Sequence, residues 1–406
     1  MQINTPQKKG GLQLGLRQNY RQFSLLVFVN MLVGAVLGVE RAVLPLMAQE
    51  QMGIHSYAVL LLFVAAFGLA KALTNYWMGK NANRYGRKPL LLLGWALALP
   101  VPWLLMYATS WHLILIANLF LGMSQGIAWT STVIMKIDLA GHRQRGLAMG
   151  LNEFAGYMAV GLASWGAARL AEQYQWEAAF WLTLGLAGLG LLLSWGLVRD
   201  TTIFMHLEEK VTSHLSPAWK ETTRRRIIGA VVQGGFVNNL NDGVLWGLLP
   251  VWLAKQYDGL GDIGLLAGIY PAVWGIGQLF TGPLADRLPK RPLLWGGMAL
   301  QGIAIAGLVM LPSFSFLIVG ALIALGVGTA MVYPTFLATI AGVVSPYARA
   351  RYLGIYRLWR DLGYVGGALL SGWLADEWSI EVAFLVVGAL TLASALVLRL
   401  RLPARL

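Results

Sequence analysis

The sequence predicts an all-α integral membrane protein with twelve transmembrane helices in two pseudo-symmetric six-helix bundles. Three observations lead to this fold class. Of the 406 residues, 57% are hydrophobic and only 12% are charged, whereas a soluble domain carries roughly 25% charged residues. Long apolar runs recur from one end of the chain to the other, and short patterns repeat at half the chain length. We therefore expect the lipid bilayer to surround most of the protein.

Twelve segments are long and apolar enough to cross a bilayer, since a spanning helix needs about 20 mostly apolar residues. Most of the links between these segments are short. The expected spans are residues 23–47, 57–79, 89–109, 112–137, 146–170, 178–198, 227–253, 263–285, 292–311, 314–340, 352–374 and 380–398.

One longer polar link divides the chain into domains. It contains Glu208, Glu209, Lys210 and the run Arg224–Arg226, so we expect a cytoplasmic linker there. The first residues are polar and lack the apolar core of a cleavable signal peptide. The expected domains are a cytoplasmic arm at 1–22, a six-helix bundle at 23–198, the linker at 199–226, a second six-helix bundle at 227–398 and a cytoplasmic tail at 399–406.

The net charge of +13 first suggests a nucleic acid partner. With both termini inside, however, 24 of the 31 Lys and Arg residues fall in cytoplasmic segments. This asymmetry fixes the orientation of a membrane protein, so we expect no nucleic acid partner and both termini on the cytoplasmic side of a bacterial inner membrane. There is no cysteine, and all five histidines lie in loops or at helix ends, so we expect no metal site.

The two halves repeat one another. The pattern Gly79-x-x-x-Asn83-Arg84 recurs as Gly282-x-x-x-Asp286-Arg287, at a shift of 203 residues. Gly150 matches Gly354 at a shift of 204, and Pro45 matches Pro250 at a shift of 205. Two related halves in the same orientation are typical of transporters that rock around a site near the bilayer midplane.

The loop at 79–88 reads Gly-Lys-Asn-Ala-Asn-Arg-Tyr-Gly-Arg-Lys. It resembles the signature G-x-x-x-D-R-x-G-R-[RK] of the major facilitator superfamily, and the loop at 282–291 resembles its degenerate second copy. With the twelve spans and the linker, the resemblance covers nearly the whole chain. It implies a secondary active transporter that needs no cofactor and acts as a monomer. The signature positions are Gly79, Asn83, Arg84, Gly86, Arg87, Lys88, Asp138, Gly282, Asp286 and Arg287.

The resemblance implies several contacts. Gly79 would let its helix pass close to the helix at 352–374, and the helix at 146–170 would pack against that at 263–285. Asn83 would cap a helix start. Asp138 occupies the place where the family often has an acid, so we expect it to meet Arg84 or Arg87.

Three positions depart from patterns of the family. Asn83 stands where the signature has aspartate, so a charge relay through it is in doubt. Proton-coupled drug exporters that resemble this family carry an arginine three residues before Gln-Gly, where this chain has Gly122. They also carry a Gly-Pro pair in the fifth helix, which is missing here. These departures weaken the assignment to the drug exporters but leave the fold prediction unchanged.

No G-x-x-x-x-G-K-[ST] motif occurs, so ion or solute gradients are the expected energy source. A charge at membrane depth is costly and often functional. Glu40 and Arg41 are such charges in the outer part of the first span. Glu40 could bind a proton or cation, or the two residues could form a pair at the outer headgroups.

The most polar patch at membrane depth surrounds Asp242. Asn238 and Asp242 are four residues apart and share a helix face, Asn241 is adjacent, and Asn30 lies on the matching first span. We favour substrate or proton binding at this patch. The alternative is an internal cap or a break in the helix.

The fifth and eleventh spans carry further charges. Glu153 is a third candidate proton site, and its counterpart in the repeat is Arg357. We expect an inner gate in which Lys71, Arg357, Arg360 and Asp361 exchange partners, with Lys71 meeting Asp361. The alternative is a permanent salt-bridge cluster.

Two other kinds of buried side chain have competing interpretations. Lys136, near the inner end of the fourth span, is expected to extend to the membrane interface. The tryptophans Trp129, Trp246 and Trp274 lie deeper and could wall a site for an amphipathic substrate, or they could face lipid or pack in the core.

We therefore expect a secondary active transporter that moves a small molecule by alternating access, with a proton as the coupling ion. Export is favoured over uptake, as by an efflux antiporter, on family frequency alone. The alternative is a transporter-like sensor or assembly partner without net transport. No nucleophile–base or metal constellation is present, so we do not expect an enzyme, and the remaining partner is membrane lipid.

Overall fold

The structure is a computed structural model that describes residues 14–140, 144–205, 226–310, 315–344 and 349–404. All regular elements within these ranges are helices. The first half contains α1 (Tyr20–Met52), α2 (Tyr57–Leu60), α3 (Leu62–Tyr85), α4 (Arg87–Ala98), α5 (Pro100–Met106), α6 (Trp111–Ala140), α7 (Arg145–Tyr174), α8 (Trp176–Gly196) and α9 (Thr202–Met205). The second half contains α11 (Arg226–Leu253), α12 (Leu260–Arg287), α13 (Lys290–Met310), α14 (Ser315–Val343), α15 (Arg349–Glu377) and α16 (Ile380–Arg401).

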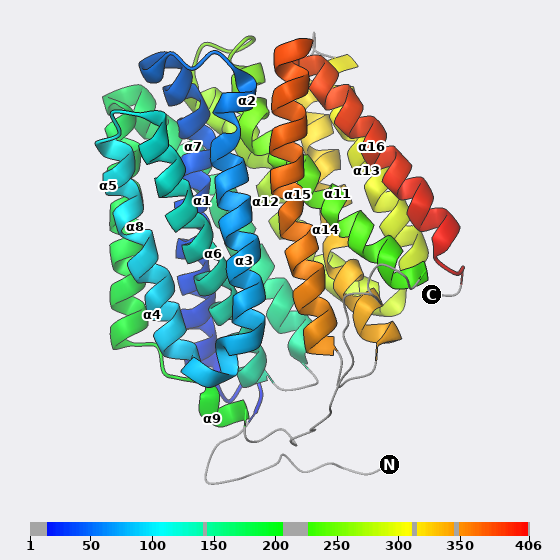
Figure 1. Ribbon diagram of the computed structural model, residues 1–406. Helices are drawn as coiled ribbons and strands as arrows, with labels where there is room; N and C mark the ends of the chain where they lie inside the picture. The colour runs from blue at the N-terminus through cyan, green and yellow to red at the C-terminus, as the bar shows by residue number, and fades with distance from the viewer. Residues whose placement is uncertain (1–13, 141–143, 206–225, 311–314, 345–348, 405–406) are drawn as a thin grey trace.

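The long helices stand side by side in one bundle, with the first half on the left of Figure 1 and the second half on the right. Helix α3 packs along α15, and α7 packs along α12, so these four helices form much of the boundary between the halves. Both helix pairings were predicted and are confirmed. The exact domain boundaries stay predictions, because residues 1–13 and 206–225 lie outside the described chain.

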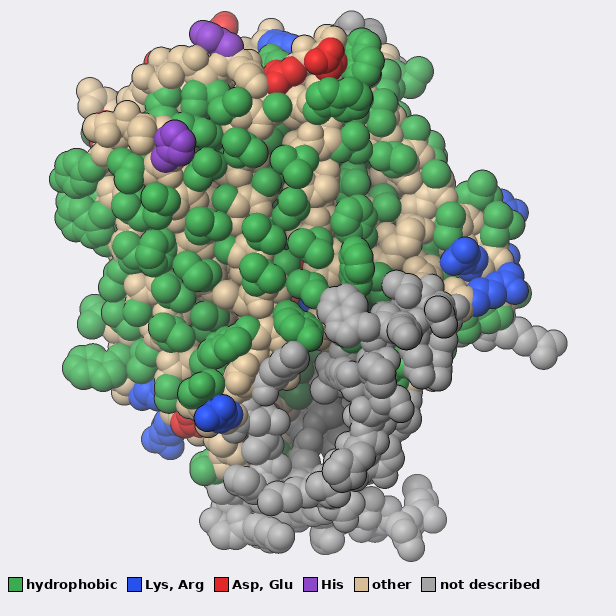
Figure 2. Space-filling model, in the orientation of Figure 1, with side chains coloured by type: hydrophobic (Ala, Val, Ile, Leu, Met, Phe, Trp, Pro, Cys, Tyr) green, Lys and Arg blue, Asp and Glu red, His purple; other side chains and the backbone are tan. Residues whose placement is uncertain are grey.

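The surface suits a bilayer. Hydrophobic side chains cover most of the bundle face seen in Figure 2. Large exposed hydrophobic residues of the described chain include Phe280, Leu192 and Trp195. Nine of the described helical segments are long and apolar enough to cross a membrane. The other three long helices, α7, α11 and α15, run through the same bundle but are less apolar. These three helices carry Glu153, Asp242 and Asp361.

The repeat seen in the sequence returns in the helix packing. Gly38 on α1 lies directly against the backbone of Val160 on α7, and Gly243 on α11 lies against the backbone of Tyr364 on α15. Val160 and Tyr364 are 204 residues apart, as the repeat requires. The contact of Gly94 with Ala128 likewise corresponds to that of Gly297 with Val332. Glycine allows helix backbones to approach closely in membranes, so both halves use the same device at the same places.

Two sequence-based expectations are wrong. A Cβ atom at Gly79 would have no described atom within 4 Å, so close helix packing does not explain this glycine. Lys136 does not extend to the interface: its side chain is 1% exposed, and its ammonium donates to the backbone oxygen of Leu26 at 3.2 Å. Helix α1 covers Lys136 and supplies this acceptor.

Polar contacts tie the halves together at the end of the bundle where α7 ends and α12 begins, the expected outer side. Asp376 at the end of α15 accepts hydrogen bonds from the Ser56 hydroxyl and the Tyr57 amide, both at 2.6 Å, at the start of α2. Arg169 on α7 pairs with Asp262 on α12 at 3.3 Å. These contacts hold the two halves against each other at this end of the bundle.

Candidate functional site

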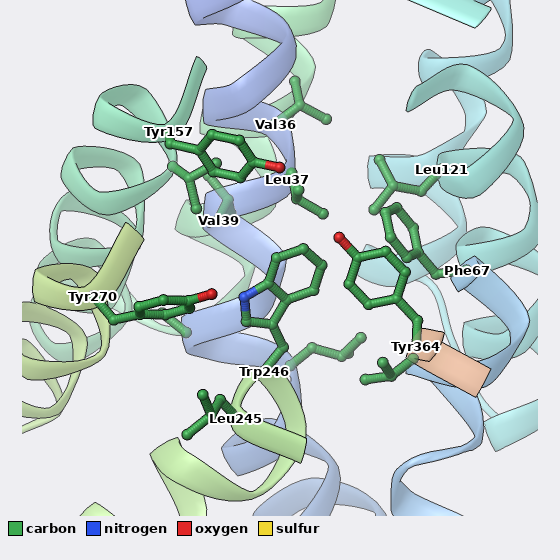
Figure 3. Packing of buried hydrophobic residues seen from close by; sticks show 14 of the residues in the cluster. Val36, Leu37, Val39, Phe67, Leu121, Tyr157, Leu245, Trp246, Tyr270 and Tyr364 are labelled. Atoms are coloured by element: carbon green, nitrogen blue, oxygen red, sulfur yellow. The ribbon is translucent and has the colours of Figure 1, made fainter. Parts of the chain in front are cut away.

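A cluster of aromatic rings occupies the middle of the boundary between the halves. The rings of Trp246 on α11 and Tyr364 on α15 are stacked with centroids 4.9 Å apart, and Phe67 on α3 meets both of them edge-on. Figure 3 shows the Trp246 ring between the rings of Tyr364 and Tyr270. Both halves thus contribute rings to one buried cluster.

A second aromatic group lies beside the first. Trp274 on α12 stacks on Tyr157 of α7 with centroids 3.5 Å apart, and it also contacts Tyr270 and Tyr333. Trp129 on α6 contacts Tyr157 at 5.2 Å. All three deep tryptophans predicted from the sequence therefore lie among the aromatic residues at the boundary.

Arg41 on α1 is held by aromatic faces rather than by an acid. Its guanidinium carbon lies 4.4 Å from the ring centroid of Phe67 and 5.1 Å from those of Phe63 and Trp246. Only 4% of Arg41 is exposed, and none of its guanidinium nitrogens has a hydrogen-bond partner among the described residues. The neighbouring Glu40 is completely buried. Its two carboxylate oxygens form no described hydrogen bond of good geometry, although the Asn118 amide lies close to them. The structure therefore places both residues inside the protein and not at the headgroups.

Lys71 on α3 is the second cation of the cluster. Its ammonium lies over the rings of Phe67 and Tyr364, each at 5.3 Å. The expected ion pair between Lys71 and Asp361 is not formed in this conformation, since within the described chain no carboxylate lies within 4 Å of Lys71. Asn75, one turn further along α3, binds Asp361 instead, at 2.6 Å.

Asp361 on α15 is fully bound by its neighbours. Arg360 donates to one of its oxygens at 2.6 and 2.9 Å, while Asn75 binds the other. Arg360 also donates to the Tyr333 hydroxyl at 2.8 Å. Of the four expected gate residues, Arg360 and Asp361 are thus paired with each other. Arg357 lines a small cavity together with Lys71.

Two further carboxylates are only partly bound. Asp242 on α11 accepts a hydrogen bond from the Tyr270 hydroxyl through one oxygen. Its other oxygen forms no described hydrogen bond of good geometry, although the Tyr364 hydroxyl lies close to the carboxylate. Glu153 on α7 accepts from Asn152 at 2.8 Å and from Trp129 at 3.3 Å through one oxygen. Its second oxygen also has no partner in the described chain.

The three predicted asparagines, Asn30, Asn238 and Asn241, form hydrogen bonds between helices of the same half. Asn30 donates to the Asn152 carbonyl and accepts from Thr132, both at 2.8 Å, which joins α1, α6 and α7. Asn241 and Asn238 both bind the side chain of Gln301 on α13, at 3.0 and 3.1 Å. Asp242 instead binds Tyr270 on α12 and lies near enough to Lys71 and Arg360 to interact with them electrostatically, so the residues of the polar patch on α11 have different neighbours.

Two cavities of about 20 Å³ each remain in the cluster. A cavity of this size holds about one water molecule. Arg41, Trp246 and Tyr270 are among the residues lining the first, and Lys71, Glu153, Arg357 and Arg360 are among those lining the second. Both cavities have walls from both halves, so a relative movement of the halves would change the volume of each.

The residues of the cluster are largely pairs related by the repeat. Each pair differs in chemistry, so the site is asymmetric although its scaffold is symmetric. The pairs are Arg41 with Trp246, Phe67 with Tyr270, Lys71 with Trp274, Trp129 with Tyr333, Glu153 with Arg357, Tyr157 with Asp361 and Val160 with Tyr364, at shifts of 203 to 205 residues. The sequence analysis did not predict the tyrosines of the cluster. Applying the repeat shift of 203 to 205 residues to the predicted site residues would have identified Tyr333 and Tyr157.

A sequence model of the Major Facilitator Superfamily matches residues 23–240 and 231–406, which together span almost the whole chain. The chain belongs to this superfamily. The Major Facilitator Superfamily consists of transporters, so the protein is a multi-pass membrane transporter and not an enzyme.

Individual relatives are distant. The chain is 22% identical to the multidrug resistance protein MdtG of Salmonella choleraesuis over 380 residues, covering 90% of this chain and 91% of that protein. MdtG of Salmonella typhimurium matches to the same extent.

Solved structures share the fold. The human organic anion transporter MFSD10 matches with a TM-score of 0.70 and 16% identity, over 93% of this chain and 99% of that one. A mutant of the nucleoside transporter NupG matches with a TM-score of 0.77 and 11% identity, over 94% of this chain and 100% of that one. The twelve-helix Major Facilitator Superfamily fold predicted from the sequence is therefore confirmed.

The superfamily's signature loop joins α3 to α4. Arg87 pairs with Asp138 at 3.3 Å, as predicted, and Asp138 also accepts from Thr201 at 2.9 Å. Arg84 instead lies over the ring of Tyr85. Gly86 has a φ of +83°, a conformation that glycine adopts without steric cost, so its place in the signature has a backbone reason.

Asp200, which follows α8, was not predicted. It accepts hydrogen bonds from the amides of Lys88 at 2.9 Å and Thr202 at 2.7 Å, so it caps the start of α4 from a distant part of the chain. Partial burial raises its pKa, but the hydrogen bonds from Thr202 and the α4 amides outweigh burial and hold the pKa below its usual value.

The remaining signature positions make few contacts in the described structure. Lys88 donates to the Trp195 carbonyl at 2.7 Å, and a Cβ atom at Gly282 would meet no described atom within 4 Å. The side chains of Asn83, Asp286 and Arg287 lie outside the described part of the structure.

Proposed function

We propose that the protein is a proton-coupled exporter of a small organic solute, with Asp242, Glu40 and Glu153 as its proton-binding groups. The observation that carries the proposal is the incomplete hydrogen bonding of these three buried carboxylates within the described chain. An ionised carboxylate away from water is costly unless its oxygens are bound. Protonation lowers this cost, so each group has a physical reason to take up a proton when the surroundings are closed.

Asp361 differs from these three carboxylates in its hydrogen bonding. Both of its oxygens are bound, by Arg360 and by Asn75, so it has no comparable reason to bind a proton. Asp242 is the strongest proton candidate, because it lies in the middle of a helix at the boundary and is fully buried. Its partner Tyr270 belongs to α12.

Export is supported by the printed names of the relatives, which describe multidrug resistance proteins. Alternating access is supported by the position of the cluster between two halves that are tied at one end. Under this proposal Lys71, Arg357, Arg360 and Asp361 form the inner gate, and the protein lies in a bacterial inner membrane with both termini in the cytoplasm. We propose that it acts as a monomer.

The test uses purified protein in vesicles that contain a pH-sensitive dye. A panel of organic anions, cations and neutral solutes is added, and the proton flux that each solute induces is recorded. Wild-type protein is expected to respond to at least one class, and Asp242→Asn is expected to abolish the response. The matched control is Asp258→Asn, an exposed acid at which the same change should have no effect.

Two outcomes would count against the proposal. If no solute moves protons although the solute itself binds, the protein is better explained as a sensor with a transporter fold. If the flux persists unchanged in Asp242→Asn, Glu40→Gln and Glu153→Gln single variants, these carboxylates are not the proton sites. Glu177→Gln, at another exposed acid, serves as the control for the two glutamates.

A further inference from the structure

Arg41 differs from Arg360 and Lys136 in having no anionic or hydrogen-bonding partner in the described structure, and it shares with Lys71 the contact with aromatic rings. Arg360 binds Asp361 and Tyr333, and Lys136 donates to the Leu26 carbonyl. Within the described chain, all three guanidinium nitrogens of Arg41 are buried and unbound. Removing one partner of a buried charge pair is strongly destabilising, so a permanent charge without a partner needs an explanation in function.

The rings around Arg41 account for its position but not for its hydrogen-bond donors. Phe63, Phe67 and Trp246 lie within about 5 Å of the guanidinium and provide cation–π attraction. Such contacts use the positive charge and leave the N–H groups of the guanidinium without acceptors.

Three polar residues near Arg41 form no hydrogen bond or ion pair with it in the described structure. Glu40 is adjacent in sequence, but no ion pair within 4 Å joins it to Arg41 in the described structure. The Ser164 hydroxyl donates to the Gly38 carbonyl at 2.9 Å, and the Tyr270 hydroxyl donates to Asp242. Arg41 and these two hydroxyl residues line the same cavity.

That cavity lies between the halves. Arg41 and Ser164 belong to the first half, and Trp246 and Tyr270 belong to the second. At about 20 Å³ it admits no more than a water-sized group in this conformation. A solute therefore reaches Arg41 only when the halves separate, which is the behaviour expected of a transport site.

We propose that Arg41 is the anion-binding group of the transport site and that the solute is an aromatic carboxylate. This inference rests on the proposed function, because it names the class of solute. A guanidinium matches a carboxylate through two parallel hydrogen bonds, and the aromatic rings of Trp246 and Tyr270 offer stacking surfaces beside it. Outward movement of an anion is favoured by an inside-negative membrane potential, which agrees with export.

The test compares the binding of three probes of similar size to the full-length protein in detergent, without a proton gradient. The probes are 2-naphthoate, the neutral 2-naphthalenemethanol and the cationic 2-naphthylmethylammonium. Wild-type protein is expected to bind the naphthoate at least about tenfold more tightly than either counterpart, as a charge-assisted hydrogen bond implies. Arg41→Met should remove this preference, and Arg41→Lys should keep the charge but weaken naphthoate binding.

The stability of Arg41→Met distinguishes binding from packing. If Arg41 serves the solute, replacing it with methionine removes an unpaired buried charge and leaves the unfolding temperature unchanged or higher. A large fall in the unfolding temperature, or a failure to fold, would show that Arg41 holds the aromatic cluster together and would overturn the proposal. Lys136→Met is the matched control, since it removes another buried cation that lines neither cavity of the cluster and should leave the naphthoate preference in place.

Equal binding of the three probes to wild-type protein, or naphthoate binding unchanged in Arg41→Met, would also overturn the anion site. Neither result bears on the proton sites, because binding is measured without a gradient. Conversely, loss of the proton proposal through the Asp242→Asn vesicle test leaves the Arg41 measurement intact. The two proposals can therefore fail separately.

Discussion

The buried acids and bases of this protein differ in how completely their polar atoms are bound. Asp361 is saturated, Asp242 and Glu153 each use one oxygen, and Glu40 and Arg41 use none within the described chain. Residue identity alone does not predict this order. It depends on which neighbours each helix brings within hydrogen-bond distance.

Asp200 gives a prediction at the scale of one residue. Its folded-state pKa is lowered by the hydrogen bonds that it accepts at the start of α4. A group with a lowered folded pKa stabilises the protein above its ordinary pKa, about 3.9 for aspartate, and this contribution is lost as the pH falls through the folded value. Asp200→Asn should therefore lower the unfolding temperature at neutral pH, and the difference from wild type should shrink in acid.

The measurement is thermal unfolding of purified protein across a pH series. Asp258→Asn is the control, because Asp258 is exposed and the charge change is identical. A difference between wild type and Asp200→Asn that stays constant down to acid pH would show that the carboxylate charge does not stabilise α4.

Some single-residue contacts could be predicted from the sequence and others could not. The signature limited the partner of Asp138 to Arg84 or Arg87, because a short loop and a helix end leave few alternatives, and the structure shows that Arg87 is the partner. The predicted pair of Lys71 with Asp361 is not formed in the described structure. Asn75, one helical turn further along α3, binds Asp361 instead. The sequence placed α3 against α15 correctly, but Asn75 and Lys71 share that helix face, and periodicity does not decide which of them reaches the carboxylate.

At the scale of elements, the contact between α3 and α15 indicates how a gate could work. Asn75 holds Asp361 in this conformation, while Lys71 on the next turn has no anionic partner within 4 Å in the described chain. Asp361, Asp242 and Glu153 all lie near enough to act on Lys71 electrostatically. A shift of α3 along α15 by about one helical turn, roughly 6 Å, would exchange Asn75 for Lys71 at Asp361.

This exchange predicts a charge-reversal rescue. Lys71→Glu and Asp361→Lys should each abolish transport, because each leaves like charges facing one another in the second conformation. The double variant should recover part of the solute-induced proton flux. If the double variant recovers no flux although it folds and inserts, the two residues do not meet during transport.

The three less apolar helices explain why some site residues could be predicted from the sequence. Helices α7, α11 and α15 are the three long helices that fall short of the apolar character of a membrane span, and their polar residues pointed to the site. The direction of each side chain was not visible: Asn238 and Asn241 bind Gln301 inside the second half, whereas Asp242 binds Tyr270 on α12. A bond to another helix depends on tertiary packing, which a single helix does not encode.

At the scale of the whole molecule, the glycine contacts show that each half is held by backbone approaches. Gly38 against Val160 and Gly243 against Tyr364 leave no room for a Cβ atom. Gly38→Ala and Gly243→Ala should each lower the free energy of unfolding by about 1–3 kcal/mol, the usual cost of overpacking. Equal effects in the two halves are expected because the contacts are related by the repeat.

Gly79→Ala and Gly282→Ala are the controls, since neither added methyl group would meet a described atom. Each should be neutral or stabilising by up to about 1 kcal/mol, because alanine favours helix more than glycine does. Unfolding of the purified variants in detergent checks all four changes. A cost at Gly79 as large as that at Gly38 would contradict this explanation of the packing.

The paired positions of the site also say something about ancestry. If one six-helix protein was duplicated and fused, Arg41 and Trp246 descend from a single codon, as do Lys71 and Trp274. The ancestral dimer would have presented the same side chain twice and could have bound a solute in two equivalent orientations. In the present chain one half supplies the cation and the other supplies the indole, so divergence after fusion would favour a single orientation of a solute that has a charged end and an aromatic end.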